Sequence, residues 1–423
     1  MGGTRHGGVR AGCLRAGPTT TTRLSHHDAS SLRSRRSGRN TQTTAAAATP
    51  RGRAIQSPSA AAADVEEVAT TTTTTWDAES LGFRKVGDPV PAGIPMRDVL
   101  SVIPPEAFEI DHAKSWKSLA LTLAATALST CFIAVAPWYL LPVAWAVAGT
   151  AFTGYFVLGH DCAHKSFHRN KIVEDVVGTA LFAALIYPYE AWRFKHNQHH
   201  AKTNMLVEDT AWHPVVLEEM DEMSPFMRKA TQALLGSPLK MFASIGHWAK
   251  WHFDLGLYKK TEKPRVLTSI ASCAAFAAVA WPLLVHYTGW FGLFKFWVMP
   301  WLGFHFWLST FTLVHHTSPH IPFKAKEAWD PVQAQLGGTV HCDYPKWIEV
   351  LCFDINVHVP HHLSPRIPHY HLRTAYDAIK ANYGQYITEG AFNLNLVKTL
   401  VNEPHVYDEK ENYKPFSEYK DRY

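Results

Sequence analysis

Residues 159–164 read GHDCAH, residues 196–200 read HNQHH and residues 358–362 read HVPHH. Because side chains three and four residues apart on an α-helix share one face, each stretch is expected to point two or three imidazoles at a common spot. Imidazole nitrogens bind zinc, copper, nickel and iron. These stretches, called boxes one, two and three below, therefore predict a metal centre and a helical scaffold that assembles it.

The boxes together supply eight histidines: His160, His164, His196, His199, His200, His358, His361 and His362. An ordinary tetrahedral site takes four ligands, so eight nitrogens indicate two metal ions. The simpler interpretation is a chance scatter, since the chain contains 25 histidines. One HxxxH alone is compatible with that interpretation. Two HxxHH patterns beside apolar segments are not, because adjacent histidines make both a poor core and an unusual surface.

The charged fraction is low for a soluble protein and unevenly spread. Of the 423 residues, 47% are hydrophobic and only 18% are charged, and the length allows one large or two modest domains. The six cysteines form no CxxC pair and indicate no disulfide framework. The net charge of +5 is small and scattered, which argues against a nucleic-acid partner.

The first 63 residues differ from the rest of the chain. They contain ten arginines, no lysine, one acidic residue (Asp28) and no long apolar run. An arginine-rich, serine-rich and acid-poor segment is typical of an organelle transit peptide, whereas the alternative is an unstructured tail. We expect a transit peptide at 1–63, a partly disordered N-terminal extension at 64–110, a membrane domain that carries the three boxes at 111–410 and a C-terminal tail at 411–423.

Two long segments are almost free of charge. Residues 118–159 contain no Asp, Glu, Lys or Arg, and residues 266–323 contain only Lys295. Each is long enough for two crossings of about 20 residues. The expected breaks are Ala136-Pro137-Trp138 and the turn at 286–290, the latter separating spans at about 267–286 and 292–314.

The connection between these segments also contains apolar stretches. Val176–Tyr189 has about 14 residues, too few for a crossing, and is expected to lie in the interface or to dip into the membrane before box two. Residues 234–257 combine tryptophans with lysines, which favours a helix on the membrane surface. A helix packed on a soluble core explains that composition equally well.

The order of spans tests the metal hypothesis. Boxes one and two lie between the second and third spans and box three follows the fourth, so all three return to the same side. Lysine and arginine are plentiful in the 160–265 connection and absent from both short turns, as the positive-inside tendency requires. The sequence thus predicts an all-α integral membrane protein with four transmembrane helices and a cap of helices that carries an all-histidine di-metal centre at one membrane face.

The boxes and their flanks resemble a known family. The motifs GHDCAHKSF (159–167), WRFKH (192–196), AKTNML (201–206) and DTAWHP (209–214) are similar to those of the membrane-bound histidine-box fatty acid desaturases, and within them to the plastid omega-6 (delta-12) acyl-lipid branch of plants and algae. The likeness extends from about residue 95 to 410. Two departures are Asn-Gln inside box two, where Asp-Arg is expected, and Phe353 in place of a histidine.

The resemblance implies a di-iron centre whose ligands are the eight box histidines and one more from the segment after the fourth span. His316 aligns best with that further histidine, although His315 and His320 are neighbouring alternatives. Carboxylates usually orient metal-bound imidazoles from behind, and Asp161, Asp209 and Asp354 are the candidates for this role, with a capping or surface role as the alternative.

The implied reaction removes hydrogens from two adjacent methylenes of a monounsaturated acyl chain of a plastid glycerolipid, using O2 and two external electrons. The sequence contains no GxGxxG after a strand, no CxxC and no His-Pro-Gly-Gly haem motif, so the electron donor is expected to be a separate protein. For the plastid branch the resemblance implies ferredoxin, which is acidic. Lys259, Lys260, Lys263 and Arg265 are candidates to steer it, the alternative being an ordinary positive-inside patch.

Three other functions are compatible with parts of the pattern. A hydroxylase, acetylenase or carotenoid-modifying oxygenase would share the boxes, because the first hydrogen abstraction is the same. A membrane metal transporter would carry its ionisable residues within the spans rather than beyond their ends. A di-haem electron carrier would leave the adjacent histidines of the HxxHH boxes unexplained.

Overall fold

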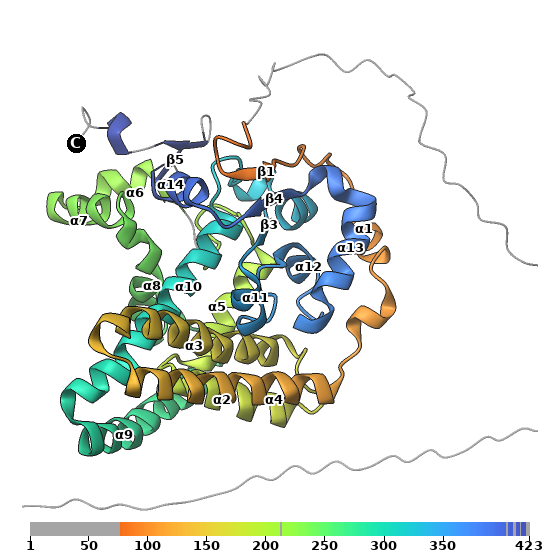
Figure 1. The fold of residues 1–423 in the computed structure, drawn as a ribbon. Coiled ribbons are helices and arrows are strands. Elements are labelled where there is room, and N and C mark those ends of the chain that lie inside the picture. Colours follow the sequence, from red (N-terminus) through yellow and green to blue (C-terminus); the bar gives the residue numbers. More distant parts are fainter. Residues whose placement is uncertain (1–76, 212–213, 403–404, 409–411, 415, 420–423) are drawn as a thin grey trace, which may run out of the picture. The chain divides into compact units, whose positions relative to one another are not determined.

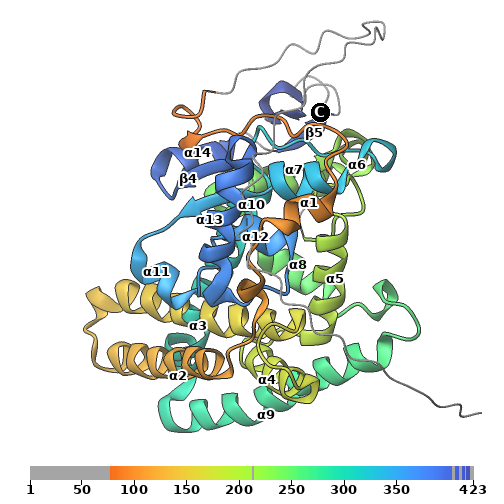
Figure 2. The same ribbon diagram turned by 90° about the vertical axis from the view of Figure 1, so that its right-hand side faces the viewer.

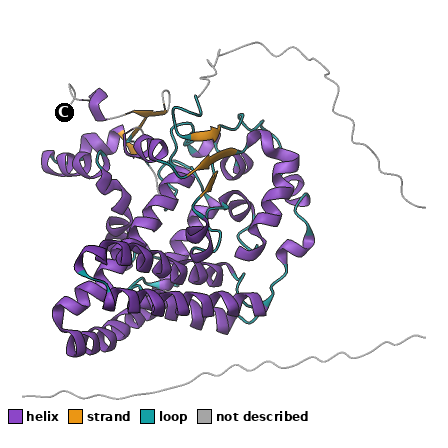
Figure 3. Cartoon of the chain, viewed as in Figure 1, coloured by secondary structure: helices purple, strands orange, loops and turns teal. Residues whose placement is uncertain are grey.

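The computed structural model describes residues 77–211, 214–402, 405–408, 412–414 and 416–419. This part of the chain is mostly helical, with six short strands (Figure 3). In Figures 1 and 2, helices α2, α3 and α9 lie together below the strands and helices α13 and α14. The proposed transit peptide at 1–63 lies outside the described residues.

The helices of the described part are α1 (Met96–Ser101), α2 (His112–Val135), α3 (Leu141–His164), α4 (Lys171–Ala184), α5 (Tyr189–Ala201), α6 (Leu217–Glu222), α7 (Pro225–Leu235), α8 (Ala243–Trp251), α9 (Lys263–Leu293), α10 (Met299–His316), α11 (Lys346–Leu351), α12 (His358–Leu363), α13 (Leu372–Tyr383) and α14 (Leu394–Asn402). The strands are β1 (Phe83–Lys85), β2 (Val215–Val216), β3 (Val340–Asp343), β4 (Thr388–Ala391), β5 (Val406–Asp408) and β6 (Asn412–Lys414).

Three helical stretches of the described part are long and apolar enough to cross a membrane: His112–Val135, Trp138–His164 and Lys263–His316. A continuous helix of the 54 residues of the last stretch would be about 80 Å long, far more than the roughly 30 Å of a bilayer core. This stretch is interrupted at Gly289, where φ is 71° and ψ is 178°. The interruption falls in the turn expected at 286–290. The expected break at Ala136-Pro137-Trp138 is also confirmed, since α2 ends at Val135.

The segment expected to lie in the interface forms α4, which is bent by 105° relative to α5. The carbonyl groups at the end of α4 lack partners within the helix, as at any helix end. Three indole N–H groups hydrogen-bond to three consecutive carbonyls here: Trp297 to Ala184 O (3.1 Å), Trp301 to Leu185 O (2.8 Å) and Trp248 to Ile186 O (2.8 Å). The bend is therefore fixed from outside by α8, α10 and the π-helical turn Phe294–Val298, and it directs α5 with box two away from α4.

The expected continuous helix over residues 234–257 is wrong. This region contains the end of α7, a 3-10 turn (Pro238–Phe242), α8 and a second 3-10 turn (Leu255–Leu257). Pro238 follows the end of α7 and cannot donate to a continuing helix. The first 3-10 turn and α8 pack against α10, and the buried Lys240 ammonium donates to Leu400 O at 2.8 Å.

Helices α3 and α10 approach each other closely at two glycines. A Cβ atom added to Gly149 would lie 2.5 Å from Gly303 Cα, and one added to Gly303 would lie 2.8 Å from Gly149 Cα. Small residues permit this close backbone packing between membrane helices. The contact matters for the site, because α3 carries box one and α10 ends at His316.

Two three-stranded sheets correct the all-α expectation. In the first, β4 pairs antiparallel with β1 and parallel with β3; in the second, β5 pairs parallel with β2 and antiparallel with β6. Strand β1 and the buried Val99 of α1 show that residues 77–110 pack on the C-terminal half of the chain. The boundary expected at residue 110 is therefore not a break in packing.

Candidate metal centre

Each box lies on a helix. His160 and His164 occupy the last turn of α3, which ends because Lys165 adopts a left-handed conformation (φ 62°). Box two lies in the C-terminal half of α5 and box three forms the short helix α12. His316 is the last residue of α10. Seven of the nine predicted histidines are buried, and His196 and His200 are half-buried.

The nine histidines come together in two groups. The first comprises His160, His164, His196, His200 and His361, and the second comprises His199, His316 and His362; within each group the nearest ring nitrogens all lie within 4.8 Å of one another. His358 adjoins the second group, with its Nε2 2.8 Å from His316 Nε2. Boxes two and three are therefore both divided between the groups.

The spacing of the ring nitrogens in the first group fits a shared cation. His361 Nε2 lies 3.1 Å from His160 Nε2 and 3.0 Å from His200 Nε2, which is 3.1 Å from His196 Nε2. A ring nitrogen either donates or accepts a hydrogen bond, so this chain of four is poorly explained by hydrogen bonds alone. With metal–nitrogen distances of about 2.0–2.1 Å, ligand nitrogens at right angles lie about 3 Å apart.

The protonation state of box three suits metal binding. Burial, followed by the neighbouring imidazoles, lowers the pKa of His358, His361 and His362 well below the ordinary value for histidine. These rings are therefore neutral at pH 7 and present lone pairs. Five nitrogens in the first group exceed the four of an ordinary zinc site, whereas the three nitrogens of the second group, with His358 beside them, leave room for another ligand on a larger coordination sphere.

Two of the three candidate orienting carboxylates contact imidazoles. His199 Nδ1 donates to Asp209 Oδ1 at 2.7 Å, and this carboxylate also accepts from the Asn204 and Ala211 N–H groups. Asp161 Oδ1 lies 3.6 Å from His160 Nδ1. The expectation for Asp354 is wrong: its carboxylate binds Arg373 and contacts no imidazole among the described residues.

Sequence reasoning missed three other groups behind the histidines. His362 Nδ1 lies 2.8 Å from Gln335 Oε1 and 3.2 Å from Thr203 Oγ1, while Gln335 Nε2 donates to His200 O at 2.6 Å. His369 Nδ1 donates to Asp161 Oδ2 at 2.7 Å. A lone glutamine or threonine carries no spacing signal, so nothing in the sequence separated them from surface residues.

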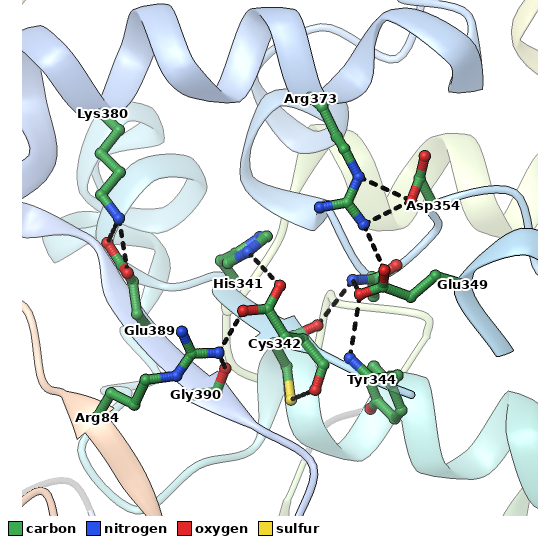
Figure 4. A network of polar contacts seen from close by, with 12 residues as sticks. Arg84, His341, Cys342, Tyr344, Glu349, Asp354, Arg373, Lys380, Glu389 and Gly390 are labelled. Atoms are coloured by element: carbon green, nitrogen blue, oxygen red, sulfur yellow. Dashed lines mark hydrogen bonds and ion pairs between the residues drawn. The ribbon is translucent and has the colours of Figure 1, made fainter. Parts of the chain in front are cut away.

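Box three is held by a polar network that reaches across the C-terminal half of the chain (Figure 4). The Glu349 carboxylate accepts from the Tyr344 N–H (3.1 Å), from Asn356 Nδ2 (3.1 Å) and from Arg373 (2.8 Å). Burial acts to raise the pKa of Glu349, but the Tyr344 N–H, Lys346 and Arg373 outweigh it, so the pKa lies below its usual value. Asn356 precedes box three by two residues, and the network therefore fixes where α12 begins.

The geometry separates the three candidate histidines after the fourth expected span. His316 belongs to the second group. His315 is buried outside both groups and stacks on His358 with ring centroids 4.2 Å apart. His320 Nε2 lies 3.0 Å from Thr388 Oγ1. Of the three, only His316 places a nitrogen among those of the boxes.

An apolar cavity adjoins the histidines. Its lining includes His160, His196, His199, His316 and His358 and apolar residues of α3 and α10, among them Phe156, Val157, Leu308, Phe311 and Leu313. The cavity therefore offers an apolar space beside histidines of both groups.

Comparisons with known proteins agree with this geometry. A family model described as fatty acid desaturase matches residues 115–390. The chain is 56% identical to a chloroplastic omega-6 fatty acid desaturase of Brassica napus over 339 residues, which cover 80% of this chain and 76% of the relative. It is 46% identical to an sn-1 oleoyl-lipid 12-desaturase of Anabaena variabilis over 325 residues, covering 77% of this chain and 93% of the relative. The chain belongs to the fatty acid desaturase family.

Proposed function

We propose that this protein is a membrane-bound omega-6 (delta-12) acyl-lipid desaturase, an oxidoreductase that introduces a second cis double bond into monounsaturated acyl chains of plastid glycerolipids. The observation that carries the proposal is the apolar cavity lined by histidines of both groups. The names of the relatives, which are omega-6 and oleoyl-lipid 12-desaturases, supply the substrate class and the position of the new bond.

The proposed cofactor is a pair of non-haem iron ions. His160, His164, His196, His200 and His361 would hold one ion, and His199, His316, His358 and His362 the other. Bound iron would supply O2 activation and removal of hydrogens from the acyl chain. The all-imidazole set suits this assignment because imidazole is a ligand for iron, and the nitrogen spacing fits a shared cation.

The protein's own contribution is position. The cavity would hold the acyl chain against the centre and exclude water, and its dimensions would determine which methylenes lie nearest to the metals. Asp209 and Gln335 would orient His199 and His362 from behind, since each accepts a hydrogen bond from the ring nitrogen that faces away from the group.

A product profile tests the proposed activity. A chain lacking the first 75 residues, expressed in a host rich in monounsaturated lipid that supplies reduced ferredoxin, is expected to raise diunsaturated C18 and C16 chains at the expense of monounsaturated ones. Fatty acids would be measured by mass spectrometry. New double bonds in saturated chains would contradict the omega-6 assignment, and hydroxylated or acetylenic products would support the alternative oxygenases on the same scaffold.

We also propose that residues 1–63 direct the protein to the plastid, where it crosses the inner envelope or thylakoid membrane four times. The third long helical stretch would supply two of the crossings, divided near Gly289. After import into isolated chloroplasts, the chain is expected to be shortened at its N-terminus and recovered with membranes. Protease accessibility should place a tag at residue 289 and a tag after residue 410 on opposite sides of the membrane. A soluble product, or tags on one side, would contradict this.

A further inference from the structure

Five basic side chains surround the end of box one. They lie on the first two turns of α2 and on the connection between α3 and α4, all are exposed, and none has an ion pair within the described part of the chain. The acidic residues near them in sequence are the exposed Glu109, the helix cap Asp111, the buried Asp161 and Glu174, and Asp175, which pairs with Arg265. We call this surface the cationic face; its residues are Lys114, Lys117, Lys165, Arg169 and Lys171.

The segments of the cationic face are packed into one surface. The Arg169 N–H donates to His112 Nε2 at 3.4 Å, and the His112 and His168 rings stack 4.0 Å apart. The Lys114 ammonium lies over the Tyr370 ring at 5.2 Å. Figures 1 and 2 both show the start of α2 beside α4. These contacts bring the segments that carry the five cations side by side.

Helix stability does not explain these cations. The N-terminus of a helix carries a partial positive charge and favours acidic side chains. Lys114 and Lys117 nevertheless lie in the first two turns of α2, and Lys171 is the first residue of α4. Their positions therefore require another explanation, either a membrane headgroup or a protein partner.

The metal centre lies directly behind this surface. Lys165 follows the group-one histidine His164 in sequence. Tyr370, which the Lys114 ammonium contacts, is half-buried. The residue before it in sequence, His369, is buried and donates to Asp161 Oδ2 at 2.7 Å. Asp161 is bonded in sequence to His160, another member of the group. One hydrogen bond and two peptide links therefore connect the surface to the centre.

We propose that the cationic face is the docking surface for the electron donor, an acidic one-electron carrier protein that delivers the two electrons in separate encounters. This inference rests on the proposed function. Opposite charge would steer the encounter and raise its rate, and the short covalent and hydrogen-bonded path would connect the docked carrier to the metals. The proximity to box one favours this partner over a lipid headgroup.

The patch that the sequence suggested for docking the electron donor is less suited to it. That patch consists of Lys259, Lys260, Lys263 and Arg265. The Arg265 guanidinium lies 2.6 Å from Glu190 and 3.6 Å from Asp175, and the Lys259 ammonium lies 3.9 Å from Glu262. These ion pairs reduce the charge that a carrier would meet. The patch still provides a matched control, because it belongs to the same connection between spans.

The test compares two charge-reversal variants of the full chain in detergent: K114E/K117E/R169E/K171E and the control K259E/K260E/K263E. Desaturation is measured at limiting reduced plant-type ferredoxin over a range of salt concentrations. We expect the first variant to be slower by about tenfold or more at low salt, with a flattened salt dependence, and the control to stay within about twofold of wild type. With dithionite and a small neutral mediator, both should match wild type.

Several results would overturn the inference. One is a loss of ferredoxin-dependent activity in the control variant without such a loss in the first variant. This result would place docking at the patch of Lys259, Lys260 and Lys263. Another is a first variant with normal ferredoxin kinetics but weaker binding to vesicles containing phosphatidylglycerol, which would identify a headgroup site. If wild type fails to desaturate even with dithionite, the proposed function itself is wrong. Because glutamate is favoured at helix N-termini, the first variant is expected to fold. An iron content equal to that of wild type would verify this.

Discussion

Replacing His316 by alanine is expected to abolish desaturation and to remove about one of the two irons of the proposed centre. His316 is the last residue of α10, and its Nε2 lies 2.8 Å from His358 Nε2 within the second group. Changes to groups behind a metal ligand already cost about 10–100-fold in affinity or activity, so loss of a ligand should exceed a hundredfold. Iron per protein and product yield would be measured at matched expression.

The control is His315→Phe. His315 is buried and stacks on His358, and neither of its ring nitrogens has a partner in the described structure. Phenylalanine keeps the stacked ring and removes only those nitrogens, so iron content and most activity should remain. Full activity in His316→Ala, or equal iron loss in both variants, would show that the second group is completed elsewhere.

The second large effect is expected at Gly303. A valine there would bring its Cβ to 2.8 Å from Gly149 Cα, which is backbone and cannot move aside as a side chain can. Overpacking of this kind costs about 3 kcal/mol, and α3 and α10 would have to separate. Because these helices carry His160, His164 and His316, Gly303→Val should lose iron and activity together with thermal stability in detergent.

Gly246→Ala is the matched control. Gly246 lies inside α8 and an added Cβ would have no atom within 4 Å. Alanine in a helix interior is favoured over glycine by about 0.5–1 kcal/mol, so this variant should be as stable as wild type or slightly more stable. If Gly303→Val unfolded at the same temperature as Gly246→Ala, the close approach of α3 and α10 would be refuted.

The amino-acid sequence alone was sufficient to predict the local elements of the centre. The HxxxH and HxxHH spacings indicated helical histidine clusters, and the structure has box one at the end of α3, box two on α5 and box three on α12. The charge-free segments located the long apolar helices and the break near Pro137. These features are local, because the spacing of histidines, a proline and the absence of charge each determine the conformation of the same few residues in which they occur.

The sequence did not indicate how the histidines are divided. In each HxxHH box, the first and last histidines are four residues apart and face nearly the same way, while the middle histidine points away from them. The structure accordingly has His196 and His200 in the first group and His199 in the second. In box three, His362 belongs to the second group with His358 beside it, and His361 belongs to the first. Which face meets which metal depends on how α5 and α12 are oriented.

Tertiary structure alone decided those orientations. The bend before α5 is fixed by three indoles, two of them more than 100 residues away in sequence. Box three is positioned by Glu349, Asn356 and Arg373, and Gln335 connects His200 with His362. Contacts of this kind join segments that are distant in the chain, and a single glutamine or tryptophan leaves no periodic trace. The sequence therefore predicted which histidines come together, and packing determined their arrangement.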